Sequence, residues 1–424
     1  MTKITLVSLR SGFLDNDKIY PPLANLYLHQ KIKLERPDVQ VRITDSPSLE
    51  EMLESDYVGV SVMTPQREQS LELLNKLKGK VKTIVGGPHV KHYTQEVTNQ
   101  GWDYIVPLDG VRPILKILDG TNERVLTDSM PSILYETEWI KPNRLDNADF
   151  LREFNYNLNG RRSTTMLTAQ GCPMTCSFCE DARTTARWTP LNLIREELDD
   201  IVSLGYSGIY LFDDLFAIAM PKVKPICEEI KKRGLIYRCN GQANFFTKWG
   251  EEFAKMLADS GCVEMAFVHE SGSQKILDNV NKRTKVEQNY LSVEYAKKYG
   301  IKVKSFLMLG LPGEDLETLT ATEEFIKNSG IDDFQLAVYY PYKGTEIRDK
   351  IDRGEDGFDL MFEGEGLGAY GQKGGSTESV VRTQAFTSKE LLYHRDRLVQ
   401  KYKPESHTPK WNDGFFDERL KEKV

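Results

Sequence analysis

Residues 170–180 read QGCPMTCSFCE, which places Cys172, Cys176 and Cys179 at spacings of four and three in a chain with six cysteines. The stretch follows a predicted strand, STTMLTAQG (163–171), so the three thiols fall in the loop at its carboxyl end. A structural zinc site is closed by four ligands, and no fourth Cys or His lies within tens of residues. Iron–sulfur clusters are normally held by four cysteines. Three thiolates on a four-iron cluster would leave one iron open to a substrate or cofactor.

From residue 163 onward the chain repeats a strand followed by a helix, and a glycine closes one helix after another. Glycine just past a helix end adopts the left-handed conformation that turns the chain toward its next strand. Six such units predict a partial (β/α)6 barrel over 163–345, and barrels of this kind carry their chemistry at the carboxyl ends of the strands. The strands after the first are predicted at YSGIYLFDD (206–214), IYRCNGQ (236–242), VEMAFVHE (263–270), IKVKSFLMLG (301–310) and DDFQLAVYYP (332–341).

Residues 1–125 alternate short apolar strands with helical stretches, which predicts a doubly wound, Rossmann-like parallel sheet. Its strands are predicted at ITLVSL (4–9), VQVRIT (39–44), YVGVSV (57–62), VKTIVGG (81–87) and DYIVPL (103–108). Ligands of such sheets bind at the carboxyl ends of the strands. The candidate binding residues there are Ser61, Met63 and Thr64 after one strand, and Gly86, Gly87 and His89 after the next.

Two further segments complete the organisation. Residues 126–162 lose the periodicity and are interpreted as a connector laid across the surface. Residues 346–424 form a C-terminal extension that is mostly helical, with a helix predicted over 388–402. Its glycine-rich, acidic stretch at 353–379 is either a plain loop or a lid over a substrate, since long loops in compact domains are often functional.

The motif CPMTCSFC is C-x3-C-x2-C with an aromatic residue before the last cysteine, and it resembles the signature of the radical S-adenosylmethionine (SAM) superfamily. The resemblance extends over roughly 163–341 through LFDDLF (211–216), HESGSQKILDNVNKRT (269–284), FLMLGLPGED (306–315) and YYPYKGTEI (339–347). It implies that the three cysteines hold a [4Fe–4S] cluster whose open iron chelates SAM, and that an electron from the cluster cleaves SAM to a 5′-deoxyadenosyl radical. The SAM-binding residues that it implies are Phe178, Asp213, Asp214, Gln242, Glu270, Ser271, Gly310 and Pro312.

The N-terminal domain resembles the B12-binding domain of cobalamin-dependent members of that superfamily. PPLANLYLHQKI (21–32), VGVSVMT (58–64), IVGGPHV (84–90) and DYIVPLDG (103–110) follow its pattern in order and spacing. The resemblance implies cobalamin beside the six strand-end residues named above. The D-x-H-x-x-G loop that supplies an axial histidine in some B12 proteins is absent, because LRSGFLDNDK (9–18) contains no histidine. The alternative is a degenerate domain that binds nothing and supports the barrel.

Three functions follow from these resemblances. The first is a radical SAM methyltransferase that uses cobalamin and acts on an unactivated carbon. The second keeps the radical step but performs rearrangement, cyclisation or oxidation, with the B12 domain degenerate or differently used. The third is an iron–sulfur protein without catalysis, against which the SAM-like segments argue.

Charge and composition restrict the partners and the compartment. The chain has 56 basic and 63 acidic residues, a net charge of −7, and no dense basic run, so no nucleic-acid partner is expected. A small-molecule or peptide substrate and an electron donor such as a flavodoxin or ferredoxin are expected instead. No apolar stretch is long enough for a membrane span, and Cys227, Cys239 and Cys262 suit a reducing compartment. The sequence therefore predicts a cytoplasmic protein without a membrane partner.

Overall fold

The computed structural model describes residues 1–10, 16, 18–128, 139–355, 358–364 and 379–403. The chain divides into two compact units. The first comprises Met1–Thr168, Arg187–Tyr210 and Lys232–Leu235, and the second Ala169–Ala186, Leu211–Lys231 and Ile236–Val424. The predicted boundaries at 125, 162 and 345 stay predictions. In the part of the chain that is described, no helix is long and apolar enough to cross a membrane.

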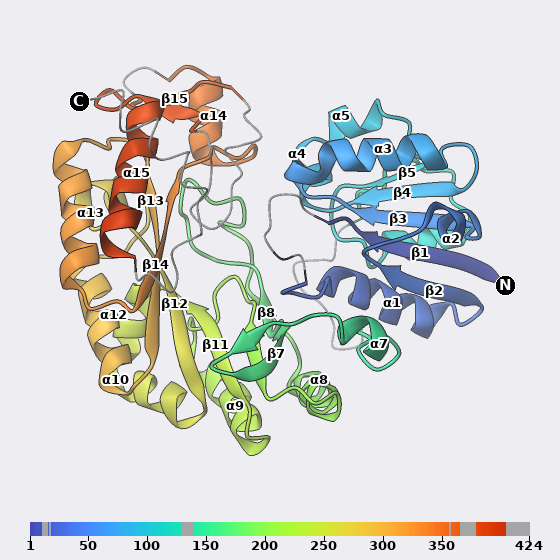
Figure 1. Ribbon diagram of the computed structural model, residues 1–424, viewed down its shortest axis with the longest axis horizontal. Helices are drawn as coiled ribbons and strands as arrows, with labels where there is room; N and C mark the ends of the chain where they lie inside the picture. Colours follow the sequence, from blue (N-terminus) through green and yellow to red (C-terminus); the bar gives the residue numbers. More distant parts are fainter. Residues whose placement is uncertain (11–15, 17, 129–138, 356–357, 365–378, 404–424) are drawn as a thin grey trace. The chain divides into compact units, whose positions relative to one another are not determined.

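The N-terminal sheet has five strands within the described residues, in the order β2-β1-β3-β4-β5, and its neighbouring strands pair in parallel (Figure 1). This is the doubly wound order in which the connection reverses between β1 and β3. The strands are β1 (Thr2–Ser8), β2 (Val39–Thr44), β3 (Tyr57–Ser61), β4 (Lys82–Gly86) and β5 (Tyr104–Val106). The helical segments are α1 (Leu23–Glu35), α2 (Leu49–Leu53), η1 (Thr64–Gln66), α3 (Arg67–Leu77), α4 (Pro88–His92), α5 (Thr94–Thr98) and α6 (Pro113–Leu118).

Two apolar layers cover the faces of this sheet, as its doubly wound pattern requires. On one face Leu26 of α1 and Ile114 of α6 pack with Ile4 of β1. On the other face Leu74 of α3 packs with Val60 of β3. The predicted Rossmann-like sheet is confirmed, and each predicted strand overlaps an observed one.

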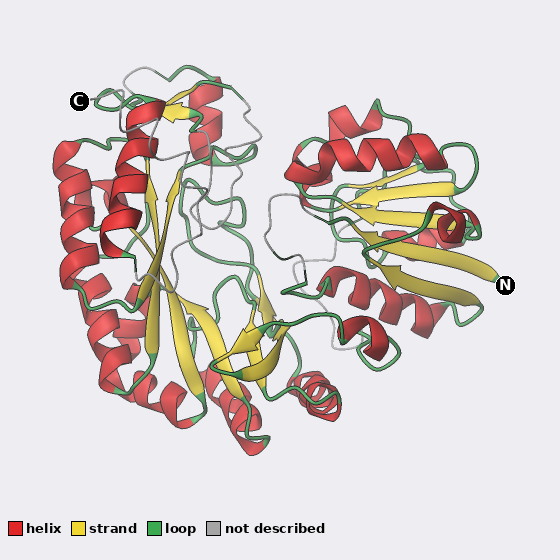
Figure 2. Cartoon of the chain, viewed as in Figure 1, coloured by secondary structure: helices red, strands yellow, loops and turns green. Residues whose placement is uncertain are grey.

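The second sheet is the predicted partial barrel. Its order within the described residues is β14-β13-β12-β11-β10-β7-β6, and helices line one face of its curved array from β11 to β14 (Figure 2). The sequence predicted six strands; the seventh, β6, is a two-residue antiparallel neighbour of β7. The strands are β6 (Asn157–Leu158), β7 (Arg161–Met166), β10 (Gly208–Leu211), β11 (Ile236–Gly241), β12 (Cys262–Glu270), β13 (Lys302–Leu309) and β14 (Asp333–Val338).

The helices between these strands are α8 (Leu191–Ser203), α9 (Met220–Lys232), α10 (Ala243–Asp259), α11 (Gln274–Asn279), α12 (Val286–Lys298) and α13 (Leu316–Asn328), and α14 (Glu346–Asp352) follows the last strand. A short hairpin, β15 (Met361–Phe362) with β16 (Val381–Arg382), precedes α15 (Ser388–Tyr402), whose bounds match the predicted C-terminal helix. In the glycine-rich stretch where a lid was one interpretation, positions 356–357 and 365–378 lie outside the described residues.

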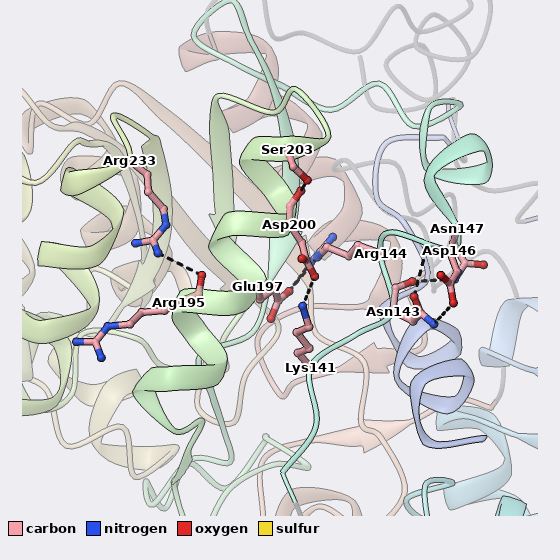
Figure 3. Close-up of polar contacts among 10 residues, drawn as sticks. All are labelled: Lys141, Asn143, Arg144, Asp146, Asn147, Arg195, Glu197, Asp200, Ser203 and Arg233. Atoms are coloured by element: carbon pink, nitrogen blue, oxygen red, sulfur yellow. Dashed lines mark hydrogen bonds and ion pairs between the residues drawn. The ribbon is translucent and has the colours of Figure 1, made fainter. Parts of the chain in front are cut away.

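The connector differs from its prediction. Its described part, which includes α7 (Ala148–Leu151), buries Asn143, Arg144 and Asn147 rather than lying across the surface. The Asn143 backbone N–H donates to the Leu26 carbonyl of α1, and Arg144 reaches α8 (Figure 3). The surface interpretation is therefore wrong for 142–144. A segment without apolar periodicity can still be buried where its polar side chains satisfy buried backbone and carboxylate groups.

Candidate functional site

The cysteine loop lies between two short paired strands, β8 (Ala169–Gln170) and β9 (Arg187–Trp188). The Cys172 N–H donates to Thr184 Oγ1 at 2.8 Å, and the Thr184 N–H donates back to the Cys172 carbonyl at 3.0 Å. Gly171 turns the chain into the loop with φ of 87°, and a Cβ there would collide with the Thr185 carbonyl oxygen. Glycine is therefore required at the position that sets the path of the first cysteine.

The three predicted cluster ligands come together. Cys176 is buried and forms an apolar cluster with Met174 and Leu215, against which the half-buried Cys172 and Cys179 pack. Phe178 packs on the same cluster. Burial raises the pKa of all three thiols, that of Cys179 to about 12, so the free thiols stay protonated at neutral pH. A bound metal would supply the charge that favours the thiolates.

The cysteine loop offers three thiols, each of which would bind one iron of a four-iron cluster. Among the described residues, no three His, Cys, Asp or Glu side chains are arranged to share one metal ion. In a four-iron cluster each thiolate binds a different iron, so its ligands stand further apart than the ligands of zinc.

The acidic pair after β10 supports the base of the cysteine loop. Asp213 is buried, and its Oδ1 accepts a hydrogen bond from the Ala169 N–H at 3.1 Å. Asp214 is exposed, and its Oδ2 accepts from the Gly171 N–H at 2.7 Å. Of the two predicted SAM contacts, Asp214 is therefore the accessible carboxylate beside the cysteines.

Three other predicted SAM contacts at the barrel strands are engaged within the protein. Glu270 ends β12 in a left-handed conformation, with φ of 64°, and pairs with the Lys282 ammonium at 2.7 Å. Gln242 donates to the Lys282 carbonyl at 3.1 Å. Ser271 is hydrogen-bonded to the Thr322 hydroxyl at 2.9 Å. Two of the three thus gather around Lys282, while the third faces α13.

Sequence reasoning missed Lys282, although it lies inside the segment HESGSQKILDNVNKRT. Its ammonium lies 5.7 Å from the centre of the Phe178 ring. Burial opposes its charge, but the Glu270 carboxylate favours it, and on balance the pKa of Lys282 is raised. A buried lysine is rare without a partner. The signal that could have found it is a Lys three positions beyond the end of the short helix that follows E-S-G-S.

The segment after β13 is shaped by its neighbours. Gly310 has φ of 80°, and its N–H donates to Glu314 Oε2 at 3.2 Å. Burial raises the pKa of Glu314 to about 7. The Pro312 carbonyl accepts from the Asn279 side chain at 2.8 Å. At these two predicted SAM contacts the Gly310 N–H and the Pro312 carbonyl are therefore engaged within the protein, both residues are buried, and their contact with SAM stays a prediction.

The predicted cobalamin residues lie at the carboxyl ends of β3 and β4. Ser61 and Gly86 are partners in the register of the two strands. Gly87 follows with φ of 101°, and a Cβ there would lie 2.7 Å from the Val62 nitrogen. Glycine at position 87 is therefore required by the packing of the chain itself, and the approach of a ligand tail to these small residues stays a prediction.

The other three of these residues differ in exposure. Met63 is 40% exposed, and Thr64, which begins η1, is half-buried. His89 is buried, and its ring stacks on Tyr93 at 4.8 Å between centroids. Its side chain is thus packed within the N-terminal sheet unit, and its role as a cobalamin contact stays a prediction.

Comparison with known proteins agrees with this geometry. The family model described as "Radical SAM superfamily" matches residues 166–326. An uncharacterized methyltransferase of Pyrococcus horikoshii is 25% identical over 360 residues, which cover 77% of this chain and 77% of that protein. The anaerobic magnesium-protoporphyrin IX monomethyl ester cyclase of Rubrivivax gelatinosus is 24% identical over 83% of this chain, which spans 66% of the cyclase.

A solved structure shows the same architecture. The radical SAM methyltransferase TsrM of Kitasatospora setae, solved with cobalamin and a [4Fe–4S] cluster bound, superposes with a TM-score of 0.68 at 17% identity. The alignment covers 84% of this chain and 78% of TsrM. This likeness confirms the predicted succession of a Rossmann-like sheet, a partial barrel and a helical C-terminal part.

Proposed function

Because this chain is a member of the radical SAM superfamily through its residues 166–326, we propose that it is a radical SAM enzyme that transfers a methyl group with the help of cobalamin. The observation that carries the proposal is the gathering of Cys172, Cys176 and Cys179 in one apolar cluster at the carboxyl end of the barrel. These three would hold a [4Fe–4S] cluster, which supplies the electron for SAM cleavage when bound.

The residues around the cysteines would bind SAM and keep water out. Asp214 offers an exposed carboxylate next to the loop, where it could accept hydrogen bonds from the amino group of SAM. Phe178, packed with the cysteines, offers an apolar face to the adenine. The turn at Gly310 and Pro312, fixed by its bonds to Glu314 and Asn279, would shape the SAM site at the end of β13. The chain's part in the reaction would thus be orientation and shielding.

Support for methyl transfer comes from the relatives and from the N-terminal sheet. The Pyrococcus horikoshii protein is named a methyltransferase, and TsrM is a methyltransferase with cobalamin bound. Here the small residues Ser61, Gly86 and Gly87 line the ends of β3 and β4, where ligands of doubly wound sheets bind. Cobalamin would supply the methyl carrier at that edge. The target would be an unactivated carbon of a small molecule or peptide.

A second candidate is supported by the Rubrivivax gelatinosus relative, which is a cyclase. In that case the radical step would lead to cyclisation, rearrangement or oxidation. The two candidates share the cluster and SAM and differ in the fate of the substrate. For either candidate we propose a cytoplasmic location, which suits the six free cysteines of the chain. We also propose an electron donor such as a flavodoxin or ferredoxin.

The test begins with anaerobic reconstitution with iron, sulfide and hydroxocobalamin, followed by gel filtration and measurement of iron and cobalt per chain. The protein is then incubated with SAM and a reductant, and 5′-deoxyadenosine is measured by chromatography. We expect four irons, near-stoichiometric cobalt and 5′-deoxyadenosine. Cobalt that is not retained, with 5′-deoxyadenosine still formed, would favour the second candidate. Failure to cleave SAM would refute both.

A pair of cysteine variants makes the assignment specific. Cys176→Ala should lose iron and SAM cleavage, because two thiolates should not retain the cluster. Cys262→Ala is the matched control, since Cys262 is a buried free cysteine on β12 outside the cysteine loop. Equal iron content in the two variants would contradict the proposed ligand set.

A further inference from the structure

A buried cation lies against the cysteine loop. The side chain of Lys282 is 4% exposed, and that of its partner Glu270 is 7% exposed. The Lys282 ammonium lies over Phe178, the residue between Cys176 and Cys179 that packs in the same apolar cluster as those cysteines. A charge in such surroundings is screened weakly by solvent, so its field acts on neighbouring groups more strongly than a surface charge would.

The segment that carries Lys282 is fastened to the cysteine loop. The Ser177 N–H donates to the Val280 carbonyl at 3.0 Å. The Asn281 side chain donates to both the carbonyl and the hydroxyl oxygen of Thr175, at 3.0 and 2.9 Å. These bonds flank Cys176 on either side, so the loop and the lysine keep a fixed relation.

The backbone around Lys282 is held in an unfavourable conformation. Asn281 and Arg283 both have positive φ, 52° and 55°, on either side of the lysine. The Gln242 and Asn244 side chains hold this turn by donating to the carbonyls of Lys282 and Arg283. Strain of this kind persists only where surrounding contacts over-determine it, and it concentrates at functional sites.

We propose that Lys282 is a positioning residue whose fixed positive charge raises the reduction potential of the cluster held by Cys172, Cys176 and Cys179, and that Glu270 acts in the opposite direction. The inference rests on the proposed function, because it requires the cluster. Reduction adds a negative charge to the cluster, which a nearby cation stabilises and a nearby anion destabilises. Net charge and solvent exposure are among the factors that set such potentials.

The test is a redox titration of the reconstituted full chain, followed by electron paramagnetic resonance and carried out without SAM. Lys282→Gln should lower the midpoint potential and Glu270→Gln should raise it. We expect each change to alter the equilibrium constant for reduction about tenfold, which is about 59 mV for a one-electron couple. Lys282→Arg, which keeps the charge, should remain near the unmodified protein.

A surface pair provides the control. Lys255 is 58% exposed and pairs with Asp259 on α10. Lys255→Gln removes the same charge from the chain but should leave the potential unchanged, because solvent screens it. Iron content and circular dichroism of every variant are measured first.

Opposite shifts for Lys282→Gln and Glu270→Gln, with Lys255→Gln unchanged, would support the inference. Shifts in the same direction, or none, would overturn it, because a purely structural pair has no reason to act with opposite signs. If Lys282→Gln fails to retain a cluster, the sign of the shift in Glu270→Gln decides. An unmodified protein that assembles no cluster would overturn the proposed function together with this inference.

Discussion

Replacing Arg144 with Met should destabilise the first unit strongly. The Arg144 guanidinium donates to Glu197 Oε1 at 2.6 and 3.1 Å (Figure 3). It also donates to the Thr165 carbonyl at 2.6 Å, and both charged side chains are almost completely buried. Removing one partner of a buried pair leaves an uncompensated charge, which costs about 3–5 kcal/mol. The loss should fall on α8 and on the connector segment that carries Arg144.

The matched double variant Arg144→Met with Glu197→Leu should recover most of that loss, because an apolar pair of similar volume avoids the desolvation of both charges. The assay is urea denaturation followed by circular dichroism, with hydrogen exchange read in α8 and in residues 139–147. Hydrogen exchange is needed to locate the loss of stability, because a chain of two units can unfold in more than one step. A single variant that loses less than about 1 kcal/mol, or a double variant no more stable than the single, would refute this reasoning.

The same pair predicts a pH dependence. Burial raises the pKa of Glu197, and the Arg144 guanidinium opposes that rise. In Arg144→Met the folded-state pKa should therefore lie further above that of the unfolded chain. A carboxyl with a raised folded-state pKa stabilises the folded state while it is protonated, and this contribution is lost as the pH rises through the folded-state pKa. The defect of the single variant should thus be greater at pH 8 than at pH 5.

Three other changes test the turns and the C-terminal helix. Gly171→Ala should reduce the iron retained after reconstitution with little loss of helical circular dichroism, because its Cβ would displace the start of the cysteine loop. Gly87→Ala should lower the melting temperature and the cobalt retained, since its Cβ would press on the Val62 backbone. Hydrogen bonds, first that from Arg397 of α15, lower the pKa of Glu323 to about 2. The stabilising contribution of the Glu323 carboxylate is present above its unfolded-state pKa and is lost as the pH falls through about 4 toward 2. Amide hydrogen exchange in α15 should therefore accelerate over that pH range, and it should accelerate less in Glu323→Gln.

The sequence predicted the strands well because their signal is local. VQVRIT at 39–44 coincides with β2, and SKELLYHRDRLVQKY at 388–402 coincides with α15, which Thr387 caps through the Glu390 N–H. Alternation, capping residues and helix-closing glycines all lie within a few positions of the element that they define. The cysteine trio was found for the same reason, since its ligands are separated by only a few residues.

The connector was misjudged because its stability comes from distant partners. Arg144 meets Glu197, which lies 53 positions later in the sequence, and the Asn147 side chain meets His29, 118 positions earlier. Neither pairing leaves a periodic mark, and an aperiodic polar stretch reads as a loop. Only the fold shows that these polar groups satisfy one another in a core.

Gln242 and Glu270 show the corresponding limit for site residues. A motif places a polar side chain at a strand end, but it does not say whether that side chain meets a ligand or another part of the chain. Here both are turned to Lys282, one through its carbonyl and one through its ammonium. Substitution of either would therefore disturb the buried cation as well as any SAM contact, so loss of activity alone could not separate the two roles. The reduction potential of the cluster, measured without SAM, can separate the two roles, because it responds to the charge of Glu270. In Gln242→Glu that potential should change little only if the added carboxylate stays away from the cysteines.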